Sequence, residues 1–421
     1  VMIKIYDMET LEEREILFRG GSGADVSAPV AEILRAVQER GDAALREYTL
    51  RFDGAAPDAL AVTAEEVDQA AAQVEPAFLA VLEEAAEHIR AYHARQKRES
   101  FVMTEREGVV LGQRIIPLAR VGIYVPGGTA AYPSTVLMNA IPARIAGVGE
   151  IIMVTPPGRD GAVNPHILAA AKIAGVTRIY KVGGAQAVAA LAYGTGTIPQ
   201  VDKIVGPGNA YVAEAKRQVF GRVNIDMIAG PSEVLVLADG RSNPAWVAAD
   251  LLSQAEHDRM AAAVLVTDSR PLAEAVAHEL ERQLAALPRA EIARASLEAN
   301  GKLIVCRDLR EGIAVANRIA PEHLELCVDN PFDYLGEIQN AGSVFLGRYN
   351  PEPMGDYFAG PNHTLPTMGT ARFYSPLSVD DFVKKSQFSY YTRDALARDY
   401  RKVSLFARKE GLDAHARAVD I

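Results

Sequence analysis

Four short segments hold the side chains of this chain whose types and spacing are typical of a metal site. These segments are residues 253–258 (SQAEHD), 321–325 (PEHLE), 355–364 and 413–415 (DAH). Half of the eight histidines lie in them, each beside carboxylate or amide side chains: His257, His323, His363 and His415. Imidazole and carboxylate ligands suit a borderline cation such as zinc, and both groups transfer protons near neutral pH. The sequence therefore predicts a metal-containing enzyme.

The first segment ends a predicted helix. Ser242-Asn243-Pro244 is a strong helix start, because proline suits the first turn. Asp250, Gln254 and His257 then follow at i, i+4 and i+7, on one face. Gln254 and His257 can present an amide oxygen and an imidazole nitrogen to one ion, with Asp250 as an outer partner. A polar, solvated helix face is the alternative that this spacing also fits.

The other segments carry proton-transfer groups and a loop. Glu322-His323 stands at the head of an alternating strand pattern and offers two groups with different pKa values, although adjacent Glu-His pairs also occur by chance. Residues 353–367 are rich in Gly and Pro yet keep Asp356 and His363, which is typical of a rigid binding loop. Near the C-terminus, Glu410 and His415 could be ordinary tail residues.

Four glycine-rich turns follow predicted strands: residues 125–128 (VPGG), 182–186 (VGGAQ), 205–209 (VGPGN) and 229–232 (AGPS). Ligands of open α/β sheets bind where strands end, and glycine lets the backbone approach a phosphate. None of the turns is a GxGxxG or GxxxxGK[ST] motif. Each alone could be a simple turn between strand and helix, but together they favour a nucleotide cleft.

The elements that must position these groups alternate along the chain. Residues 27–95 are predicted to be helical, with one long helix from Glu65 to Gln96 that leaves His88 and His93 on the surface. From about residue 109, short apolar strands alternate with helices, which is typical of parallel sheets covered on both faces. The predicted strands are residues 151–154, 178–182, 203–205, 233–237, 262–266 and 303–305. From Ser378 onward we expect a polar helical tail that needs a neighbouring surface.

Composition excludes several functional classes. A chain of 421 residues is expected to form more than one domain. The net charge of −10 argues against nucleic acid as a partner, and the basic stretch 95–98 is interpreted as a solvated helix end. Neither a signal peptide nor an apolar run long enough to span a membrane is evident, and the isolated Cys306 and Cys327 suit a reducing cytoplasm.

Taken together, the motifs resemble those of histidinol dehydrogenases. The matching segments occur in the family's order over roughly two-thirds of the chain, from 122–128 (GIYVPGG) to 413–415. They include 181–187, 206–209, 229–233, 253–258, 320–325 and 360–367. The resemblance implies a cytoplasmic, zinc- and NAD-dependent homodimer with shared active sites. It also implies a four-electron oxidation of L-histidinol to L-histidine through L-histidinaldehyde, in the last two steps of histidine biosynthesis.

The resemblance also assigns roles residue by residue. It implies Glu322 and His323 as the catalytic pair. The implied zinc ligands, one ion per subunit, are Gln254, His257, Asp356 and His415. The implied substrate contacts are these ligands together with Ser232, His323, His363 and Glu410. The implied NAD contacts are Tyr124, Gln186 and Asn209.

The implied fold consists of two incomplete Rossmann-like, doubly wound α/β domains and a helical tail exchanged between subunits. Residues 24–119 and 236–372 are expected to form the domain that carries the metal and catalytic residues. Residues 120–235 are expected to form the NAD-binding domain. The remaining segments, 1–23 and 373–421, are expected to form an extended dimerisation tail.

Four other readings compete with this one. A relative that oxidises another alcohol would not need His363 and Glu410, which suit an imidazole- and amine-bearing substrate. A metallohydrolase could share the metal ligands but would not need the glycine turns. A cysteine-dependent aldehyde dehydrogenase needs an exposed nucleophile, whereas Cys306 and Cys327 both lie in apparent strands. A non-catalytic protein of the same fold would not need Glu322 and His323.

Overall fold

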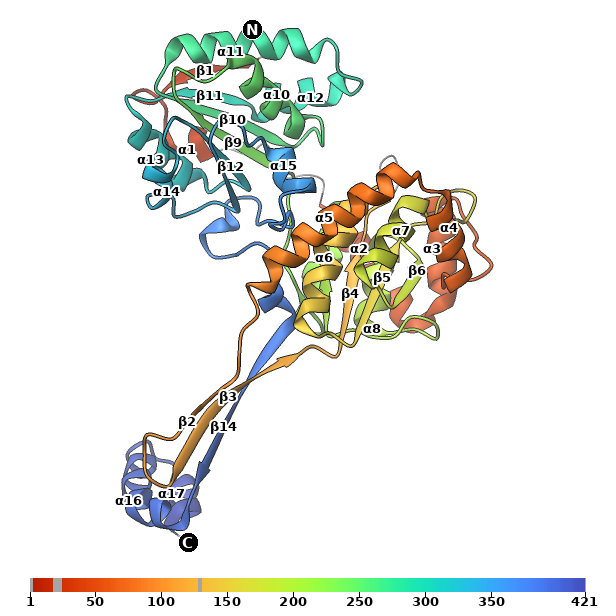
Figure 1. Cartoon of the computed structure of the whole chain (residues 1–421). Helices are drawn as coiled ribbons and strands as arrows, with labels where there is room; N and C mark the ends of the chain where they lie inside the picture. Colours follow the sequence, from red (N-terminus) through yellow and green to blue (C-terminus); the bar gives the residue numbers. More distant parts are fainter. Residues whose placement is uncertain (1–2, 18–24, 128–130, 421) are drawn as a thin grey trace.

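The computed structural model describes residues 3–17, 25–127 and 131–420, so Gly128 of the first glycine turn lies outside the described residues. These residues form two α/β bodies and a long stem that ends in a small helical unit (Figure 1). None of the helices in the described ranges is long and apolar enough to cross a membrane.

The first body is built on a five-stranded parallel sheet with the order β6-β5-β4-β7-β8. Its strands are β4 (Arg120–Tyr124), β5 (Glu150–Thr155), β6 (Arg178–Lys181), β7 (Lys203–Val205) and β8 (Asn224–Ile225). Its helices are α2 (Ser27–Arg40), α3 (Asp42–Asp53), α4 (Ala64–Gln73), α5 (Pro76–Ala94), α6 (Pro133–Ala146), α7 (Pro165–Ala174), α8 (Gly184–Tyr193) and α9 (Ala210–Val219). Successive residues of β5 alternate between two separate cores, because strand side chains point to opposite faces. The sheet is therefore covered on both faces, as its apolar strands predict.

The placement of the N-terminal helices corrects three predictions. We expected residues 24–119 to share a domain with residues 236–372. Instead, α2 packs on α8, α4 on α7 and α5 on α6, so residues 27–94 cover the five-stranded sheet. The expected single helix from Glu65 to Gln96 is also wrong, because the chain bends before Pro76 and forms α4 and α5. His93 is fully buried rather than on the surface, with its Nδ1 2.7 Å from Oε1 of Gln96.

The second body is built on a six-stranded parallel sheet with the order β1-β11-β10-β9-β12-β13. Its strands are β1 (Ile5–Asp7), β9 (Glu233–Ala238), β10 (Ala262–Thr267), β11 (Lys302–Val305), β12 (His323–Cys327) and β13 (Ser343–Leu346). Its helices are α1 (Glu13–Leu17), α10 (Pro244–Ala255), α11 (Arg270–Leu284), α12 (Ala290–Asn300), α13 (Leu309–Ile319), α14 (Phe332–Leu335) and α15 (Glu352–Tyr357). Because β1 pairs with β11, the described part of residues 1–23 belongs to this sheet and not to the tail.

Both sheets share one topology. When β4 to β8 and, in the larger sheet, β9 to β13 are each numbered 1 to 5 along the chain, both sheets have the order 3-2-1-4-5. The larger sheet has β1 as an additional strand at its edge. This is the Rossmann order without its sixth strand. The expectation of two incomplete Rossmann-like domains is therefore confirmed. All six strands predicted from apolar runs are also confirmed, as β5, β6, β7, β9, β10 and β11.

The stem joins distant parts of the sequence. It consists of β2 (Phe101–Met103), β3 (Val109–Pro117) and β14 (Val383–Tyr391), with β14 antiparallel to β3 along its whole length. Two short 3-10 turns, Thr370–Arg372 and Val379–Phe382, precede β14. The helices α16 (Arg393–Lys409) and α17 (Asp413–Asp420) cap its far end (Figure 1). The expectation of a wholly helical tail is thus wrong for residues 383–391.

Candidate active site

Glu322 and His323 lie at the amino-terminal edge of the six-stranded sheet. His323 is the first residue of β12 and pairs with Val234 of β9 and Ser343 of β13. The strand expected after Glu322 is present as β12, and all five of its residues are buried. The strand is central and both of its faces are covered by helices. Both catalytic candidates are therefore held rigidly and away from solvent, with exposures of 7% for Glu322 and 2% for His323.

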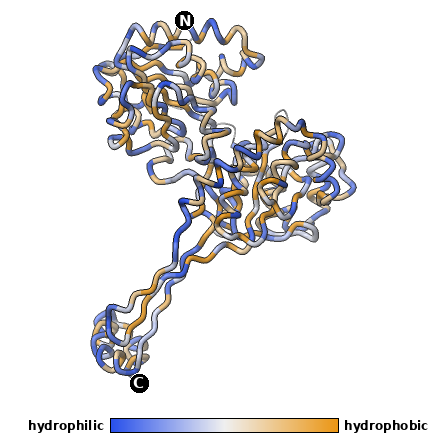
Figure 2. The backbone as a smooth tube through the Cα atoms, viewed as in Figure 1, coloured by the Kyte–Doolittle hydropathy of each residue, from blue (hydrophilic) through white to orange (hydrophobic). Residues whose placement is uncertain are grey.

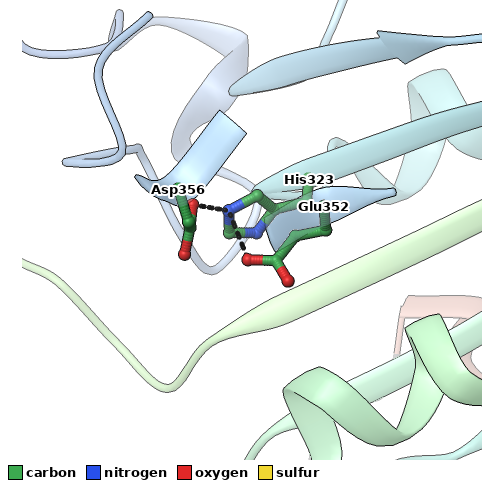
Figure 3. A group of neighbouring side chains, drawn as sticks. All are labelled: His323, Glu352 and Asp356. Atoms are coloured by element: carbon green, nitrogen blue, oxygen red, sulfur yellow. Dashed lines mark hydrogen bonds and ion pairs between the residues drawn. The ribbon is translucent and has the colours of Figure 1, made fainter. Parts of the chain in front are cut away.

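The imidazole of His323 has one nitrogen fixed and one directed at carboxylates. Its Nδ1 lies 3.0 Å from the carbonyl oxygen of Glu233, which can only accept, so Nδ1 carries a hydrogen and donates it. Its Nε2 lies 3.3 Å from Oδ1 of Asp356 and 3.8 Å from Oε1 of Glu352 (Figure 3). The ring is thereby oriented with Nε2 as the group available for proton transfer.

Burial and neighbouring charges shift the proton affinities of the pair. Burial raises the pKa of Glu322 to about 8, although the charge of His323 opposes this shift. Burial also disfavours the charged form of His323, but Glu322, Asp356 and Glu352 together raise its pKa to about 10. The side chain of Glu322 accepts a 2.8 Å hydrogen bond from the backbone N–H of Glu233. Strongly perturbed groups that face one another in this way are typical of proton-transfer sites.

A metal ion fits beside this pair. One ligand atom each from His323, Glu352 and Asp356 lies within 4.8 Å of the others. Burial opposes ionisation of Asp356, but its hydrogen bond and ion pair with His323 hold the pKa of this carboxyl well below its usual range. An ionised carboxylate is what a metal ligand requires.

Gln254 supports the same conclusion from the neighbouring helix. It lies near the end of α10 and is 1% exposed, and neither its amide oxygen nor its nitrogen has a hydrogen-bond partner among the described residues. A buried amide without partners is costly unless something else binds it, and a cation would satisfy its oxygen. His257 follows two residues after α10 ends and is solvent-accessible. Desolvation by the protein around its ring nevertheless lowers its pKa, against the charge of Asp356, and so favours the neutral form that binds metals.

Asp250, expected as an outer partner of this set, lies elsewhere. It shares a hydrogen bond with the buried Glu325 on β12, and burial raises the pKa of both carboxyls. The backbone N–H of Glu352 in turn donates to Glu325 over 3.2 Å. Asp250 and Glu325 therefore tie α10, β12 and α15 together rather than facing the site.

Glu352 was not predicted from the sequence. It stands between Pro351 and Pro353, a context that resembles a loop, yet it begins the short helix α15. Asp356 follows four residues later, so both carboxylates lie on the same face of this helix. This spacing was the signal that could have identified it. Burial raises the pKa of Glu352 to about 8, with a further contribution from the charge of Asp356.

The loop after α15 connects the two bodies. His363 holds its Nδ1 3.0 Å from the carbonyl oxygen of Asp356, and its Nε2 lies 3.3 Å from Oγ1 of Thr135 in α6. Nδ2 of Asn362 donates to the carbonyl oxygen of Met138, also in α6, over 2.6 Å. Ser232 directly precedes β9 at the same amino-terminal edge as His323. The structure thus brings Glu322, His323, Asp356 and His363 together where the two bodies meet.

The predicted cofactor residues gather at the carboxyl edge of the five-stranded sheet. Tyr124 ends β4, and its hydroxyl accepts a 3.0 Å hydrogen bond from the N–H of Gly184 at the start of α8. Burial raises the pKa of Tyr124 to about 12, so the hydroxyl stays protonated. Gln186 is 1% exposed, and both polar atoms of its side chain lack a protein partner in the described ranges. Asn209 caps α9 by accepting from the N–H groups of Tyr211 and Val212.

Two predicted site residues lie far from the rest. Glu410 ends α16 and His415 lies in α17, both exposed at the far end of the stem (Figure 1). Within one chain they are separated from His323 by the length of the stem. The structure of a single chain therefore does not join them to the other predicted ligands.

The cysteines are poorly suited to nucleophilic catalysis. Both are buried, burial raises the pKa of Cys306 to about 12, and burial together with Glu325 raises that of Cys327 further. Catalytic cysteines need a stabilised thiolate. The alternative of a cysteine-dependent aldehyde dehydrogenase is therefore disfavoured.

Comparison with known proteins gives a consistent result. The family profile described as histidinol dehydrogenase matches residues 19–421. The histidinol dehydrogenase of Listeria monocytogenes serotype 4b is 54% identical over 413 residues, which cover 98% of this chain and 96% of that protein. The one from Geobacter sulfurreducens is 57% identical over 411 residues, covering 96% and 95%. A crystal structure of histidinol dehydrogenase from Elizabethkingia anophelis has a TM-score of 0.95 at 40% identity and covers 100% of this chain and 97% of that one.

Proposed function

Because this chain belongs to the histidinol dehydrogenase family, we propose that it oxidises L-histidinol to L-histidine through L-histidinaldehyde, with two molecules of NAD as hydride acceptors. The observation that carries this proposal is the group of the buried Glu322 and His323 with the half-buried Asp356, which lies beside the contact between His363 and Thr135. This group places proton-transfer side chains next to the body that bears the predicted cofactor residues.

We infer that zinc binds to Gln254, His257 and Asp356 of one subunit and to His415 of the partner subunit. The unpartnered amide of Gln254 and the ionised carboxylate of Asp356 support this assignment. When bound, zinc supplies a template that holds the imidazole and amino nitrogens of histidinol. Ser232 and His363, with Glu410 of the partner subunit, are proposed to complete the substrate site.

The residues of the chain supply the proton transfers. Asp356, one of the carboxylates that raise the pKa of His323, is proposed to bind zinc, which would leave less negative charge beside Nε2 and favour the neutral ring. Nε2 of His323 then takes the hydroxyl proton of histidinol as a hydride leaves the carbinol carbon for NAD. Glu322 then accepts a proton from the water that adds to the aldehyde, while His323 returns its proton to the aldehyde oxygen, so that a neutral hydrate forms and Nε2 is free again. His323 takes a proton from the resulting hydrate as the second hydride leaves for a second NAD, which yields the carboxylic acid. The fixed Nδ1–H bond to the carbonyl oxygen of Glu233 keeps Nε2 in place for both transfers.

We propose that the active form is a homodimer whose stems exchange. The stem and its cap expose many large apolar side chains: Val102, Tyr390, Leu396, Val403, Leu405 and Phe406, all between 45% and 68% exposed. Figure 2 shows hydrophobic segments along the stem, outside either packed body. Exposed apolar surface of this extent is typical of an interface. A two-fold dimer would bring each cap to the other subunit reciprocally.

The direct test is to follow NADH at 340 nm with purified protein and L-histidinol. We expect two NADH per histidinol consumed and L-histidine as the product. One NADH per substrate would show an alcohol dehydrogenase that stops at the aldehyde. No NADH from histidinol, with full activity toward another alcohol, would contradict the proposed substrate.

A further inference from the structure

The turn after β7 lies where the strand order of the five-stranded sheet reverses. From β4 the chain continues to β5 and β6 on one side, whereas β7 and β8 lie on the other side. Such a reversal opens a crevice between neighbouring strand ends. Gly206, the first residue after β7, has a φ of +110°, and a Cβ there would lie 2.1 Å from the carbonyl oxygen of Tyr124. The two strand ends are therefore in backbone contact, and only glycine fits.

The side chains of a buried ion pair form hydrogen bonds with both backbone polar groups of Gly206. Nζ of Lys216 in α9 donates to the carbonyl oxygen of Gly206 over 3.1 Å. Oδ2 of Asp226, which follows β8, accepts the N–H of Gly206 over 2.8 Å. The two side chains pair directly with each other through Oδ1 of Asp226, which also accepts the N–H of Met227 over 2.6 Å. The Lys216 and Asp226 side chains are only 3% and 1% exposed.

A pair this deeply buried is a poor source of stability, because the loss of hydration offsets most of the mutual attraction. Its geometric effect is specific. The peptide groups on both sides of Gly206 are fixed, and the chain then runs through Pro207 and Gly208 to Asn209, which caps α9. The 206–209 turn is thus fixed at Gly206 by hydrogen bonds to Lys216 and Asp226, and at Asn209 by its hydrogen bonds to the first turn of α9.

We propose that Lys216 and Asp226 are positioning residues for the dinucleotide, which fix the 206–209 turn in the shape that receives the cofactor. This proposal rests on the proposed function, because it takes the crevice beside Tyr124 to be the cofactor site. The pair does not touch the catalytic residues. Its contribution is to remove backbone freedom that binding would otherwise have to suppress.

The test is the double variant Lys216→Met/Asp226→Asn in the full-length protein. It leaves no unpaired buried charge, and the amide oxygen of Asn can still accept one backbone N–H. We expect the Kd for NADH, measured by fluorescence titration, to rise at least about tenfold, together with the KM for NAD. The KM for histidinol should stay within about twofold. Amide hydrogen exchange of residues 206–212, measured without ligand, should become faster.

Lys203→Met is the matched control. Lys203 is the first residue of β7, the strand whose other end leads into Gly206. It is buried like Lys216, and its Nζ pairs with Oδ1 of Asp381 over 2.8 Å. This variant should lose stability without any change in the Kd for NADH. An unchanged Kd in the double variant, or an equal rise in the Lys203 variant, would overturn the proposal. Failure of the wild-type protein to bind NADH would instead contradict the proposed function, and exchange at residues 206–212 would still decide whether the pair fixes the turn.

Discussion

Replacing Glu322 with glutamine should separate the two oxidation steps. In the proposed chemistry only the aldehyde step needs an activated water, and only Glu322 is assigned to activate it. Burial raises the pKa of Glu322 to about 8, so this carboxyl is mostly uncharged at pH 7 and an amide mimics its resting form. The oxygen of glutamine can still accept the 2.8 Å hydrogen bond from the N–H of Glu233. The fold and the position of His323 should therefore be retained.

The expected magnitudes follow from these contacts. Loss of a general base typically costs about 10²- to 10⁴-fold, so the aldehyde step should slow by that factor. The alcohol step should slow by less than about tenfold, because His323 keeps its Nδ1 bond. Glu322→Ala is the informative contrast. It leaves the buried N–H of Glu233 without this acceptor, which costs about 1–3 kcal/mol, so it should lower stability and slow both steps.

The assay is single-turnover NADH formation from histidinol and from histidinaldehyde, with melting temperatures measured in parallel. In the wild-type protein the aldehyde step should accelerate as pH rises through about 8, because the base must be ionised, and the glutamine variant should lose this dependence. Because the pKa of Glu322 is higher in the folded protein than in the unfolded chain, its protonated form stabilises the fold. This contribution to stability is complete below about pH 4.5 and is lost as the pH rises through about 8. The variant should thus melt higher than the wild type above pH 8. Equal slowing of both half-reactions would refute the division of roles.

Four further results are expected. Co-expressed His257→Ala and His415→Ala chains should regain roughly a quarter of wild-type activity, because half of the randomly paired dimers are mixed and each mixed dimer has one intact site. Inactivity of tag-purified mixed dimers would exclude an active site shared between subunits. Chelation should abolish turnover reversibly but leave the far-UV circular dichroism nearly unchanged, because each sheet has its own core; unfolding of the metal-free protein at room temperature would contradict this. Glu352→Gln should lower kcat roughly tenfold, or about 1.4 kcal/mol, because it removes a carboxylate beside His323. The zinc content should stay near one ion per subunit, whereas a loss of zinc in this variant would show that Glu352 is a metal ligand. Asp53→Asn should raise the melting temperature at pH 8 but not at pH 3.5. Burial raises the pKa of Asp53 from 3.8 to about 6, so the stability that its protonated form provides is complete below about pH 3.8 and is lost as the pH rises through about 6. An equal shift of the melting temperature at both pH values would exclude this carboxyl as the cause.

The elements that the sequence predicted well are those whose signal is local. Runs such as residues 151–154 and 262–266 are apolar on both faces because helices cover both sides of each sheet, and this composition is readable without knowing any partner. Residues 383–391 were missed as a strand for the opposite reason. Their sequence, VKKSQFSYY, is mostly polar, and the strand forms by pairing with β3, more than 260 residues earlier in the chain. No local pattern encodes that pairing.

The domain assignment failed for a related physical reason. The amphipathic stripes of residues 27–94 require an apolar surface, but either sheet offers one, so periodicity alone does not choose between them. In the structure, contacts such as α2 with α8 settle the choice in favour of the five-stranded sheet. The proximity of Glu322, His323 and Asp356 was easier to anticipate, because these residues carry their chemistry in residue type. Glu352 was missed because its flanking prolines concealed the helix that turns it toward His323.

The two sheets share a strand order but present opposite edges to the proposed reaction. The five-stranded sheet uses its carboxyl edge, where Tyr124 ends β4. At the corresponding edge of the six-stranded sheet, Arg348 forms ion pairs with Asp239 and Asp329, so charged side chains fill the place where a ligand of that fold usually binds. The proposed catalytic residues, Glu322 and His323, lie at the amino edge instead. Hydride transfer requires the reacting carbon and the nicotinamide to be adjacent. Using opposite edges lets the bodies meet through His363 and Thr135, and the reaction is proposed to take place at that junction.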